Sequence, residues 1–538
     1  MESDNASSIS LDENISDSNE VDDFTNCFNC DNDEIKDEDY LNQVPELSRV
    51  ILYAGDSLDD NQWMRKRIKS DFGIDYLDPN TSIRKAFKFI SSKLIEANEN
   101  LNIYLENFIE ELKNSCQKIL DDCEGNTDSD SLKVIKDLAH DDCWISTSYH
   151  RKTAVETYYV GRIRFRMANH KSNSQTIYLE APSSVDKEGI IPLDLSQFKN
   201  QSKNQDFEEF SLFPGKIVVL KGQNFSGNHL VVSKFINFNR FLRPLFPLQC
   251  PQILQEQEPF NIVCACGPFL KIDDNNQIDF LDTFWMKSIA NYLKRYNPDV
   301  LFLLGPFIEE SMLSSLERWS RQNLMLNENL YPYQWNLDRL FNYQIRFLCK
   351  ELEGLSVLTR IVLIPSSNEL GKINVFPMYP LEVKCQKSVI SFSNPSILNI
   401  GGVAMGLTTT DILLHLSRNE IHKYIDPTHH KSGERIRRLC EYVLSHRNFY
   451  PLLPPDLNLN LEYSKYNALL MRQTPHILVL SSVLRPFIYN IDGTIVINPG
   501  KVAKNCIARI ILEPLKSTQQ YTGSLSQFTN VEIIKLNY

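Results

Sequence analysis

Three short apolar runs decide how this sequence folds: NIVCACGPF at 261–269, VLFLLGPF at 300–307 and RIVLIPSS at 360–367. Each run has the length of a buried strand, and each ends in a Gly-Pro or Pro-Ser-Ser turn. Helical patterns separate the runs, the longer one extending from Leu313 to Leu352. This order predicts a domain in which strands and helices alternate.

Four further apolar runs make the C-terminal half of the chain rich in strands. They are SILNIGGVAMGL (396–407), ILVLSSVL (477–484), TIVINPG (494–500) and ARIILEPL (508–515). No linker-like stretch interrupts them. We therefore expect residues 251–538 to form one large domain of an α+β multidomain chain.

Upstream of this domain the apolar pattern has the period of two that half-buried strands show. YYVGRIRFRM (158–167) and QTIYLEA (175–181) alternate, IIPLDLSQF (190–198) follows, and 211–236 continues the pattern around an Asn-Phe-Ser-Gly turn. Strands of this length and spacing, with such turns between them, predict a small five-stranded barrel. We expect an OB-fold β-barrel over residues 151–250.

The first 150 residues fall into two parts. Residues 1–44 contain fourteen acidic side chains and one lysine, so residues 1–45 are predicted to be an acidic disordered tail. Residues 46–150 are predicted to be helical, because apolar residues recur at intervals of three and four, as at Leu101, Leu105 and Phe108.

Charge and cysteine content narrow the class of protein. The chain has 68 acidic and 56 basic side chains and a formal net charge of −12, so any nucleic-acid contact must be local. No apolar stretch reaches the roughly 18 residues of a membrane-spanning helix, so no membrane contact is expected.

The twelve cysteines are scattered, which favours a reducing compartment. Cys27 and Cys30 have no second ligand pair nearby, which favours free thiols over a zinc site.

The turns after the three apolar runs are poor in metal ligands. Cys264-Ala265-Cys266 comes directly before the first Gly-Pro turn. Proline occupies position 306 in the second turn, and the third turn contains Ser366-Ser367-Asn368-Glu369. The layout resembles the calcineurin-type metallophosphoesterases, which place Asp-x-His, Gly-Asp-x-x-Asp and Gly-Asn-His-Asp/Glu at these turns. Two-metal catalysis needs a bridging carboxylate, and proline has no ligand atom. The resemblance therefore implies an inactive phosphoesterase-like β-sandwich flanked by helices, with no catalytic residue, metal site or cofactor.

Histidine and cysteine placement leads to the same expectation. The ten histidines are His140, His150, His170, His229, His415, His422, His429, His430, His446 and His476. None is expected on a strand-end turn in the order that a two-metal site requires. His476 is next to a strand, but it lies at the beginning of that strand and not at its end. Cys264 and Cys266 could be substitute thiolate ligands, but we expect buried small hydrophobes that point to opposite faces of their strand.

An OB-fold beside an inactive phosphoesterase-like domain resembles the B subunits of eukaryotic replicative DNA polymerases, and the α branch most closely. The segments that carry the resemblance are SLFPGKIVVLKGQNFSG (211–227), ACGPF (265–269), LLGPFIE (303–309), SNPSILNIGGVAMGLTTTDILLHL (393–416), FYPLLPP (449–455) and INPGKVAKN (497–505). The resemblance implies a nuclear, non-catalytic scaffold that binds the C-terminal domain of the polymerase α catalytic subunit. Primase and DNA would be reached mainly through the complex. Members usually begin with a helical docking module, and because only a short segment precedes Pro45 we expect that module to be absent or much reduced.

Three alternatives stay open. The equivalent subunit of polymerase δ or ε would share the fold, although the Gly-Leu-Thr-Thr-Thr-Asp and Tyr-Pro-Leu-Leu-Pro-Pro blocks argue against it. An active metallophosphoesterase with atypical ligands is the second. The third is a single-strand-binding OB protein, with Arg162, Arg164 and Arg166 on one strand face and Tyr158 and Tyr159 as stacking platforms. A solvated or protein-contacting face is favoured, because three positive charges are few against −12.

Two further stretches are expected to have structural roles. FINFNRFLRPLFPL (235–248) should be buried at the junction of the barrel and the next domain, although its phenylalanines could anchor a partner. A hydroxyl of Thr408–Thr410 should cap a helix that starts near Asp411, with His415 as a satisfied core or interface side chain. The stretch from Asp426 to Glu434 should be a surface loop.

Overall fold

The computed structural model describes the chain in segments: residues 48–54, 72–85, 87–89, 92–122, 130–139, 148–169, 172–186, 189–196, 210–238, 246, 249–270, 283–314, 317, 337–353, 359–383, 388–423, 434–516, 521 and 523–536. The chain divides into two compact units. The barrel unit takes its described residues from Ser92–Arg243 and His415–Asp456. The two-sheet unit takes its described residues from Ile35–Ser91, Pro244–Leu414 and Leu457–Tyr538.

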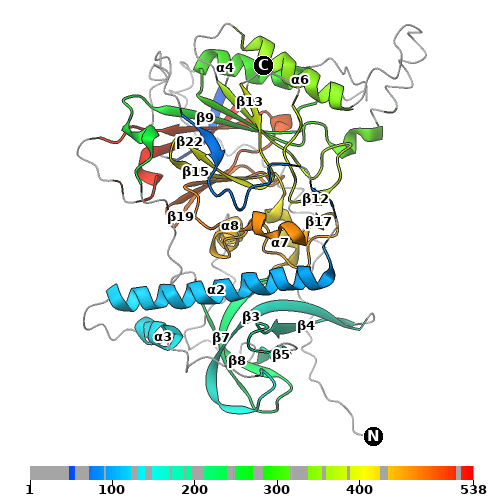
Figure 1. Ribbon diagram of the computed structural model, residues 1–538, viewed down its shortest axis with the longest axis vertical. Coiled ribbons are helices and arrows are strands. Elements are labelled where there is room, and N and C mark those ends of the chain that lie inside the picture. Colours follow the sequence, from blue (N-terminus) through cyan, green and yellow to red (C-terminus); the bar gives the residue numbers. More distant parts are fainter. Residues whose placement is uncertain are drawn as a thin grey trace, which may run out of the picture. The chain divides into compact units, whose positions relative to one another are not determined.

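The two-sheet unit contains a seven-stranded and a six-stranded mixed sheet (Figure 1). The first has the order β1-β22-β21-β9-β10-β11-β13: β1 (Ser48–Ala54), β22 (Thr529–Leu536), β21 (Cys506–Leu512), β9 (Phe260–Cys266), β10 (Val300–Leu304), β11 (Arg360–Ile364) and β13 (Val389–Ser391). The second has the order β19-β20-β18-β15-β14-β2: β19 (Phe487–Ile491), β20 (Thr494–Asn498), β18 (Ile477–Leu480), β15 (Val403–Thr408), β14 (Ser396–Ile400) and β2 (Ile74–Tyr76).

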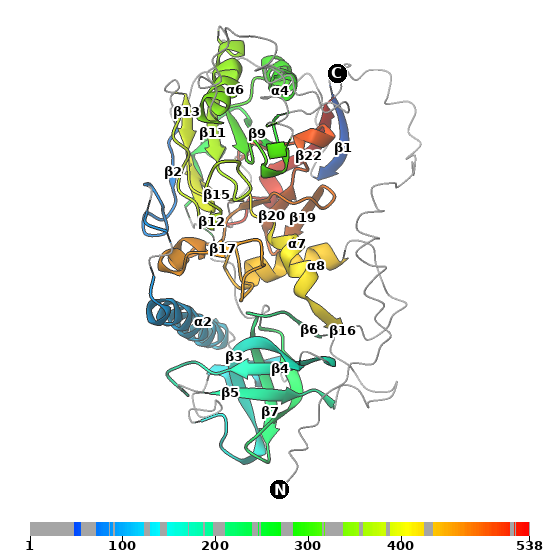
Figure 2. The same ribbon diagram turned by 90° about the vertical axis from the view of Figure 1, so that its right-hand side faces the viewer.

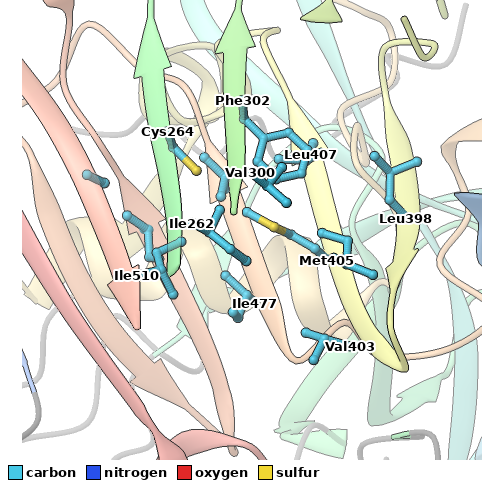
Figure 3. Packing of buried hydrophobic residues seen from close by; sticks show 14 of the residues in the cluster. Ile262, Cys264, Val300, Phe302, Leu398, Val403, Met405, Leu407, Ile477 and Ile510 are labelled. Atoms are coloured by element: carbon cyan, nitrogen blue, oxygen red, sulfur yellow. The ribbon is translucent and has the colours of Figure 1, made fainter. Parts of the chain in front are cut away.

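Apolar side chains fill the space between these two sheets (Figure 3). Phe302 of β10 packs there with Met405 of β15 and Ile477 of β18, and all three are fully buried. Successive side chains of a strand point to opposite faces. Leu303, the neighbour of Phe302, therefore enters a second apolar cluster on the other face of the seven-stranded sheet.

Two helices cover that other face, α4 (Phe284–Tyr296) and α6 (Leu337–Glu351) (Figure 2). Ile289 of α4 and Ile345 of α6 are fully buried in the cluster that contains Leu303. Helix α4 ends at Asn297, which adopts the left-handed conformation (φ 45°) and donates its N–H to the Leu293 carbonyl. Asparagine tolerates this conformation better than most residues, which makes it a suitable C-terminal cap.

A closed five-stranded barrel with the order β3-β4-β5-β8-β7 forms the core of the barrel unit. Its strands are β3 (Thr153–Asn169), β4 (Ser172–Glu180), β5 (Ile190–Asp194), β7 (Ile217–Asn224) and β8 (Leu230–Ile236). Tyr159, Ile163 and Leu179 are among the fully buried side chains that fill it. The barrel predicted from the period-two pattern is confirmed.

Helices and a short sheet complete the barrel unit. They are α2 (Leu94–Asp122), α3 (Asp130–Ala139), α8 (Glu434–Ser445) and the pair β6 (Phe210–Leu212) and β16 (Ile421–Lys423). The predicted periodicity of α2 is confirmed, because Leu101, Leu105 and Phe108 are buried on one face. From the same face the Tyr104 hydroxyl donates to the His446 carbonyl (2.7 Å).

Two strands lie where helix was predicted. β1 and β2 both fall within 46–150, and each adds an edge strand to one sheet, β1 beside β22 and β2 beside β14. The prediction was wrong because both pairing partners are far away in the sequence. The apolar run of β1 is short, and its partner lies at the other end of the chain.

The remaining short elements are α7 (Ile412–Asn419), the parallel pair β12 (Val375–Phe376) and β17 (Asn460–Leu461), and the 3-10 helices Gln252–Gln255, Glu310–Met312, Tyr463–Leu469, Val502–Lys504 and Ser526–Phe528. Of the helices in the described segments, none has both the length and the apolar character needed to cross a bilayer.

Candidate functional site

The turns after β9, β10 and β11 lie side by side at one edge of the seven-stranded sheet. These strands run parallel, with Leu304 level with Cys266 on one side and with Ile364 on the other. The Gly267 N–H donates to the Leu304 carbonyl (2.8 Å). A β-carbon on Gly267 would overlap the Pro306 carbonyl oxygen. Glycine is therefore needed for the two Gly-Pro turns to approach this closely.

Glu369 in the third turn holds the second turn in place. Its carboxylate accepts the N–H of Phe307 (2.8 and 3.0 Å to the two oxygens) and the N–H of Ile308 (2.9 Å). Burial raises the pKa of Glu369 to about 7, although the two amide hydrogen bonds act to lower it. Both carboxylate oxygens are thus engaged by backbone donors of this chain.

Asn394, which lies between β13 (Val389–Ser391) and β14 (Ser396–Ile400), is bonded to the end of β15. Its amide nitrogen donates to the Thr409 hydroxyl (2.7 Å), and its amide oxygen accepts the Thr408 hydroxyl (3.1 Å) and the Thr409 N–H (3.2 Å). The Thr409 hydroxyl in turn donates to the Pro365 carbonyl (2.7 Å). All of these side chains are buried. The Asn394 amide is therefore committed to structural bonds within the two-sheet unit.

Asp411 connects the turn after β15 to the turn after β18. Its carboxylate accepts the Ser482 hydroxyl (2.7 Å) and the Val483 N–H (2.8 Å), and it also caps α7 by accepting the Leu414 N–H (3.1 Å). The helix was expected to be capped by a hydroxyl of Thr408–Thr410. That expectation is wrong, because the carboxylate of Asp411, which directly precedes the helix, reaches the free N–H groups of the first turn.

Lys501 places a positive charge close to the end of β9. Its ammonium donates to the Ser481 hydroxyl (2.9 Å). Burial raises the pKa of the Cys266 thiol, while the Lys501 charge and a hydrogen bond with Ser481 oppose that rise. The thiol therefore stays protonated at neutral pH, and a protonated thiol is a poor metal ligand.

The strand-end donors do not fit a two-metal centre. The carboxylates of Glu369 and Asp411 bind backbone and hydroxyl donors, and Asn394 binds threonines. Within the described segments, no three His, Cys, Asp or Glu side chains gather closely enough to hold a metal ion. The expectation of no catalytic, cofactor or metal residue remains a prediction.

Two protein-family models match separate parts of the chain. The model for the B subunit of DNA polymerase alpha/epsilon matches residues 262–489, in the part that carries the strand-end turns. The model for the OB domain of the DNA polymerase alpha B subunit matches residues 132–238, which include the barrel. The chain is thus similar to DNA polymerase B subunits in both matched regions. The OB-fold prediction is confirmed by the second match.

Curated relatives carry the same description. The DNA polymerase alpha B subunit of Mus musculus is 29% identical over 347 residues, which cover 63% of this chain and 51% of the relative. The Schizosaccharomyces pombe protein of the same description is 28% identical over 367 residues (62% and 58%), and the Saccharomyces cerevisiae protein 23% over 398 residues (64% and 51%). The chain thus spans about half the length of the curated relatives it matches.

The arginine face proposed for β3 of the OB barrel is largely neutralised. Arg162 is buried, donates to the Leu101 carbonyl (2.6 Å) and lies 3.5 Å from the Glu180 carboxylate. Arg164 makes two hydrogen bonds to the same carboxylate (2.6 and 2.7 Å). Arg166 is exposed. Two of the three guanidinium groups therefore serve contacts within the unit.

The two tyrosines proposed as stacking platforms are not available to a base. Tyr159 is fully buried in the barrel, and Tyr158 is 5% exposed with its hydroxyl bonded to Asp137 (3.0 Å). The hypothesis was wrong because it rested on the alternation of residues along the strand, which places the arginines on one face. That pattern does not show that the barrel and α3 bury both tyrosine rings.

The expected faces of Cys264 and Cys266 also need correction. Both thiols are fully buried, as predicted, but both lie in the apolar cluster between the two sheets. Residues two apart on a strand share a face. The intervening Ala265 lies in the cluster on the opposite face.

His446 and His415 make hydrogen bonds within the barrel unit. His446 Nε2 accepts the Ile217 N–H (3.1 Å) and its Nδ1 lies 2.9 Å from the Tyr442 carbonyl, while burial lowers its pKa to about 3. His476 precedes β18, as predicted. His415 Nδ1 lies 2.9 Å from the Tyr450 hydroxyl, which confirms a satisfied side chain.

The aromatic stretch 235–248 divides between the two units. Phe235 stacks on Phe210 and Phe238 packs on Phe108, both in the barrel unit. Phe246 stacks on His476 in the two-sheet unit. Other predictions fall outside the described residues: the tail at 1–45 with Cys27 and Cys30, Phe241, the loop at 426–433 with His429 and His430, and His140 and His170.

Sequence reasoning missed the strand-end residues whose side chains connect neighbouring turns. Asn394, Asp411 and Ser481 were not singled out as a group. A usable signal was present, since polar residues directly follow apolar strands in Leu-Thr-Thr-Thr-Asp (407–411) and Leu-Ser-Ser (480–482).

Proposed function

We propose that this chain is a non-catalytic accessory subunit of DNA polymerase α–primase. It would tether the polymerase catalytic subunit to primase during initiation of DNA replication and synthesis of RNA–DNA primers. The family-model match and the similarity to the curated relatives support the coarser part of this proposal, an accessory subunit of a DNA polymerase. The proposed location is the nucleus, where such a complex acts.

The observation that carries the non-catalytic part is the bonding of Glu369. A carboxylate that would act in two-metal phosphoryl chemistry must present free lone pairs to the metal ions. Glu369 instead accepts the amides of Phe307 and Ile308 beside Pro306. We infer an inactive phosphoesterase-like fold, in which the strand-end turns have become a structural connection between loops.

The proposed partner is the C-terminal domain of the polymerase α catalytic subunit. Stable protein interfaces need an apolar centre, often with aromatic or arginine anchors. A large domain that has no catalytic function can supply such a surface. Primase would be reached through the complex, and no membrane contact is proposed.

A chemical test separates this proposal from an active phosphoesterase. The purified chain should hold no stoichiometric manganese, iron or zinc and should not hydrolyse phosphodiesters, even with added metal ions. Pro306→Ala and Cys266→Ala variants serve as controls. Hydrolysis that copurifies with the unmodified chain and is lost in either variant would contradict the proposal.

A further inference from the structure

The turn that joins β7 to β8 in the barrel unit presents an aromatic ring to solvent. Phe225 in this turn is 56% exposed, and Val155 on the adjacent strand β3 is 73% exposed. The pairing of β3 with β7 is irregular here, with extra β3 residues between Thr153 and Thr157. Bulges of this kind redirect side chains away from the sheet.

The turn that carries Phe225 is fixed by hydrogen bonds beneath it. Asn224 is fully buried, donates its amide to the Tyr149 carbonyl (2.7 Å) and accepts the Gly227 N–H (2.7 Å). His150 Nδ1 lies 3.0 Å from the Gly227 carbonyl. A ring on a turn ordered in this way loses little conformational entropy when it binds a ligand.

Two cationic residues lie beside this turn. Arg151 and Lys152 are both exposed, and Lys152 Cγ is 3.6 Å from the position that a β-carbon on Gly227 would occupy. Among the described residues, neither cation is within ion-pair distance of a carboxylate. Glu156 in the irregular part of β3 is paired with Lys221 (3.3 Å). This surface is therefore locally positive in a chain of net charge −12.

We propose that this surface, made of Phe225, Val155, Arg151 and Lys152, binds single-stranded nucleic acid. One base would stack on the Phe225 ring, and neighbouring phosphates would pair with Arg151 and Lys152. Exposed aromatic rings beside cations are the combination by which proteins bind single strands without reading their sequence. An acidic peptide would match the charge alone, whereas a single strand offers a flat base next to each phosphate.

This site differs from the arginine face of β3, whose guanidinium groups Arg162 and Arg164 are engaged by Glu180. It would give the chain a direct nucleic-acid contact in addition to any made by its partners. The proposal does not depend on partner binding, which is measured separately.

Fluorescence anisotropy of a labelled oligothymidylate, titrated with the full chain, tests the stacking contact. Phe225→Ala should weaken binding about tenfold, the effect expected for loss of one stacked base. Phe225→Trp should keep the affinity, because the larger ring still stacks. Leu457→Ala removes a fully exposed apolar side chain in the other unit and should change nothing. Circular dichroism of each variant shows that the fold is intact.

Salt dependence tests the phosphate contacts. Two contacts to a single strand predict about a sevenfold loss of affinity between about 50 and 200 mM salt. Arg151→Gln combined with Lys152→Gln should remove most of that dependence, while Lys118→Gln on α2 should not. The proposal is overturned if the full chain does not bind, or if Phe225→Ala binds like the unmodified chain. It is also overturned if polyglutamate competes with the oligothymidylate for the same residues and Phe225→Ala changes the affinity for neither ligand.

Discussion

Replacing Glu369 by glutamine should change how stability depends on pH in the two-sheet unit. Glu369 is buried, and its pKa is raised to about 7 from an ordinary value of 4.5. A carboxyl group with a raised folded-state pKa contributes its full stabilisation below its unfolded pKa. That contribution is lost as the pH rises through about 7, because the folded state must then bury the charge. Glutamine has the same shape but does not ionise.

The size of the effect follows from the difference between the two pKa values. A shift of about 2.5 units corresponds to about 3 kcal/mol when both states are fully ionised. Between pH 5 and pH 8 the Glu369→Gln variant should therefore gain about 2.5 kcal/mol relative to the unmodified chain. At pH 5 the variant should be the less stable protein, because the NH2 group of glutamine replaces one carboxylate oxygen and cannot accept the N–H bond that this oxygen receives from Phe307 or Ile308.

Hydrogen exchange read by mass spectrometry gives a local measurement in a chain with two units. Peptides that contain Phe307 and Ile308 should report the opening free energy of the second turn across this pH range. Glu310→Gln in the neighbouring 3-10 helix is the control, since Glu310 is exposed. The reasoning is refuted if the difference between the Glu369→Gln variant and the unmodified chain stays constant from pH 5 to pH 8, or if it has the opposite sign.

Two further predictions concern buried polar groups. His446→Ala should destabilise the barrel unit by about 3 kcal/mol, because it leaves the Ile217 N–H without an acceptor. The unmodified chain should lose about 2 kcal/mol of stability from pH 7 to pH 5, because the pKa of His446 is lowered in the folded state and only the unfolded state takes up the proton. Urea unfolding at the two pH values should show that the His446→Ala variant lacks this loss. Asn394→Ala should cost about 2–4 kcal/mol by leaving buried threonine groups unpaired; an unchanged melting temperature would contradict the assigned role.

The barrel could be predicted from the sequence because its information is local. Alternation and turn residues between 158 and 236 are sufficient to indicate short antiparallel strands. The apolar strands that end in Gly-Pro turns were predicted for the same reason. β1 could not be predicted in this way, because its seven residues become a strand only through pairing with β22 at the far end of the chain.

The candidate site was predictable in position but not in bonding. The sequence shows that Pro306 and Glu369 follow buried strands, which places them at strand ends. It does not show that the Glu369 carboxylate reaches the amides of Phe307 and Ile308, which lie far earlier in the chain. That contact depends on the parallel register of β10 and β11. Burial of Tyr158 was missed for a similar reason, since α3 supplies the Asp137 partner.

The most direct test of the proposed scaffold function is a competition for partners. The chain is co-expressed with the C-terminal domains of the polymerase α, δ and ε catalytic subunits, each with a different tag, and captured from moderate salt before gel filtration. The account predicts a one-to-one complex with the polymerase α domain that persists when residues 1–43 are removed. Separate elution of the chain, or preferential capture of the δ or ε domain, would contradict it.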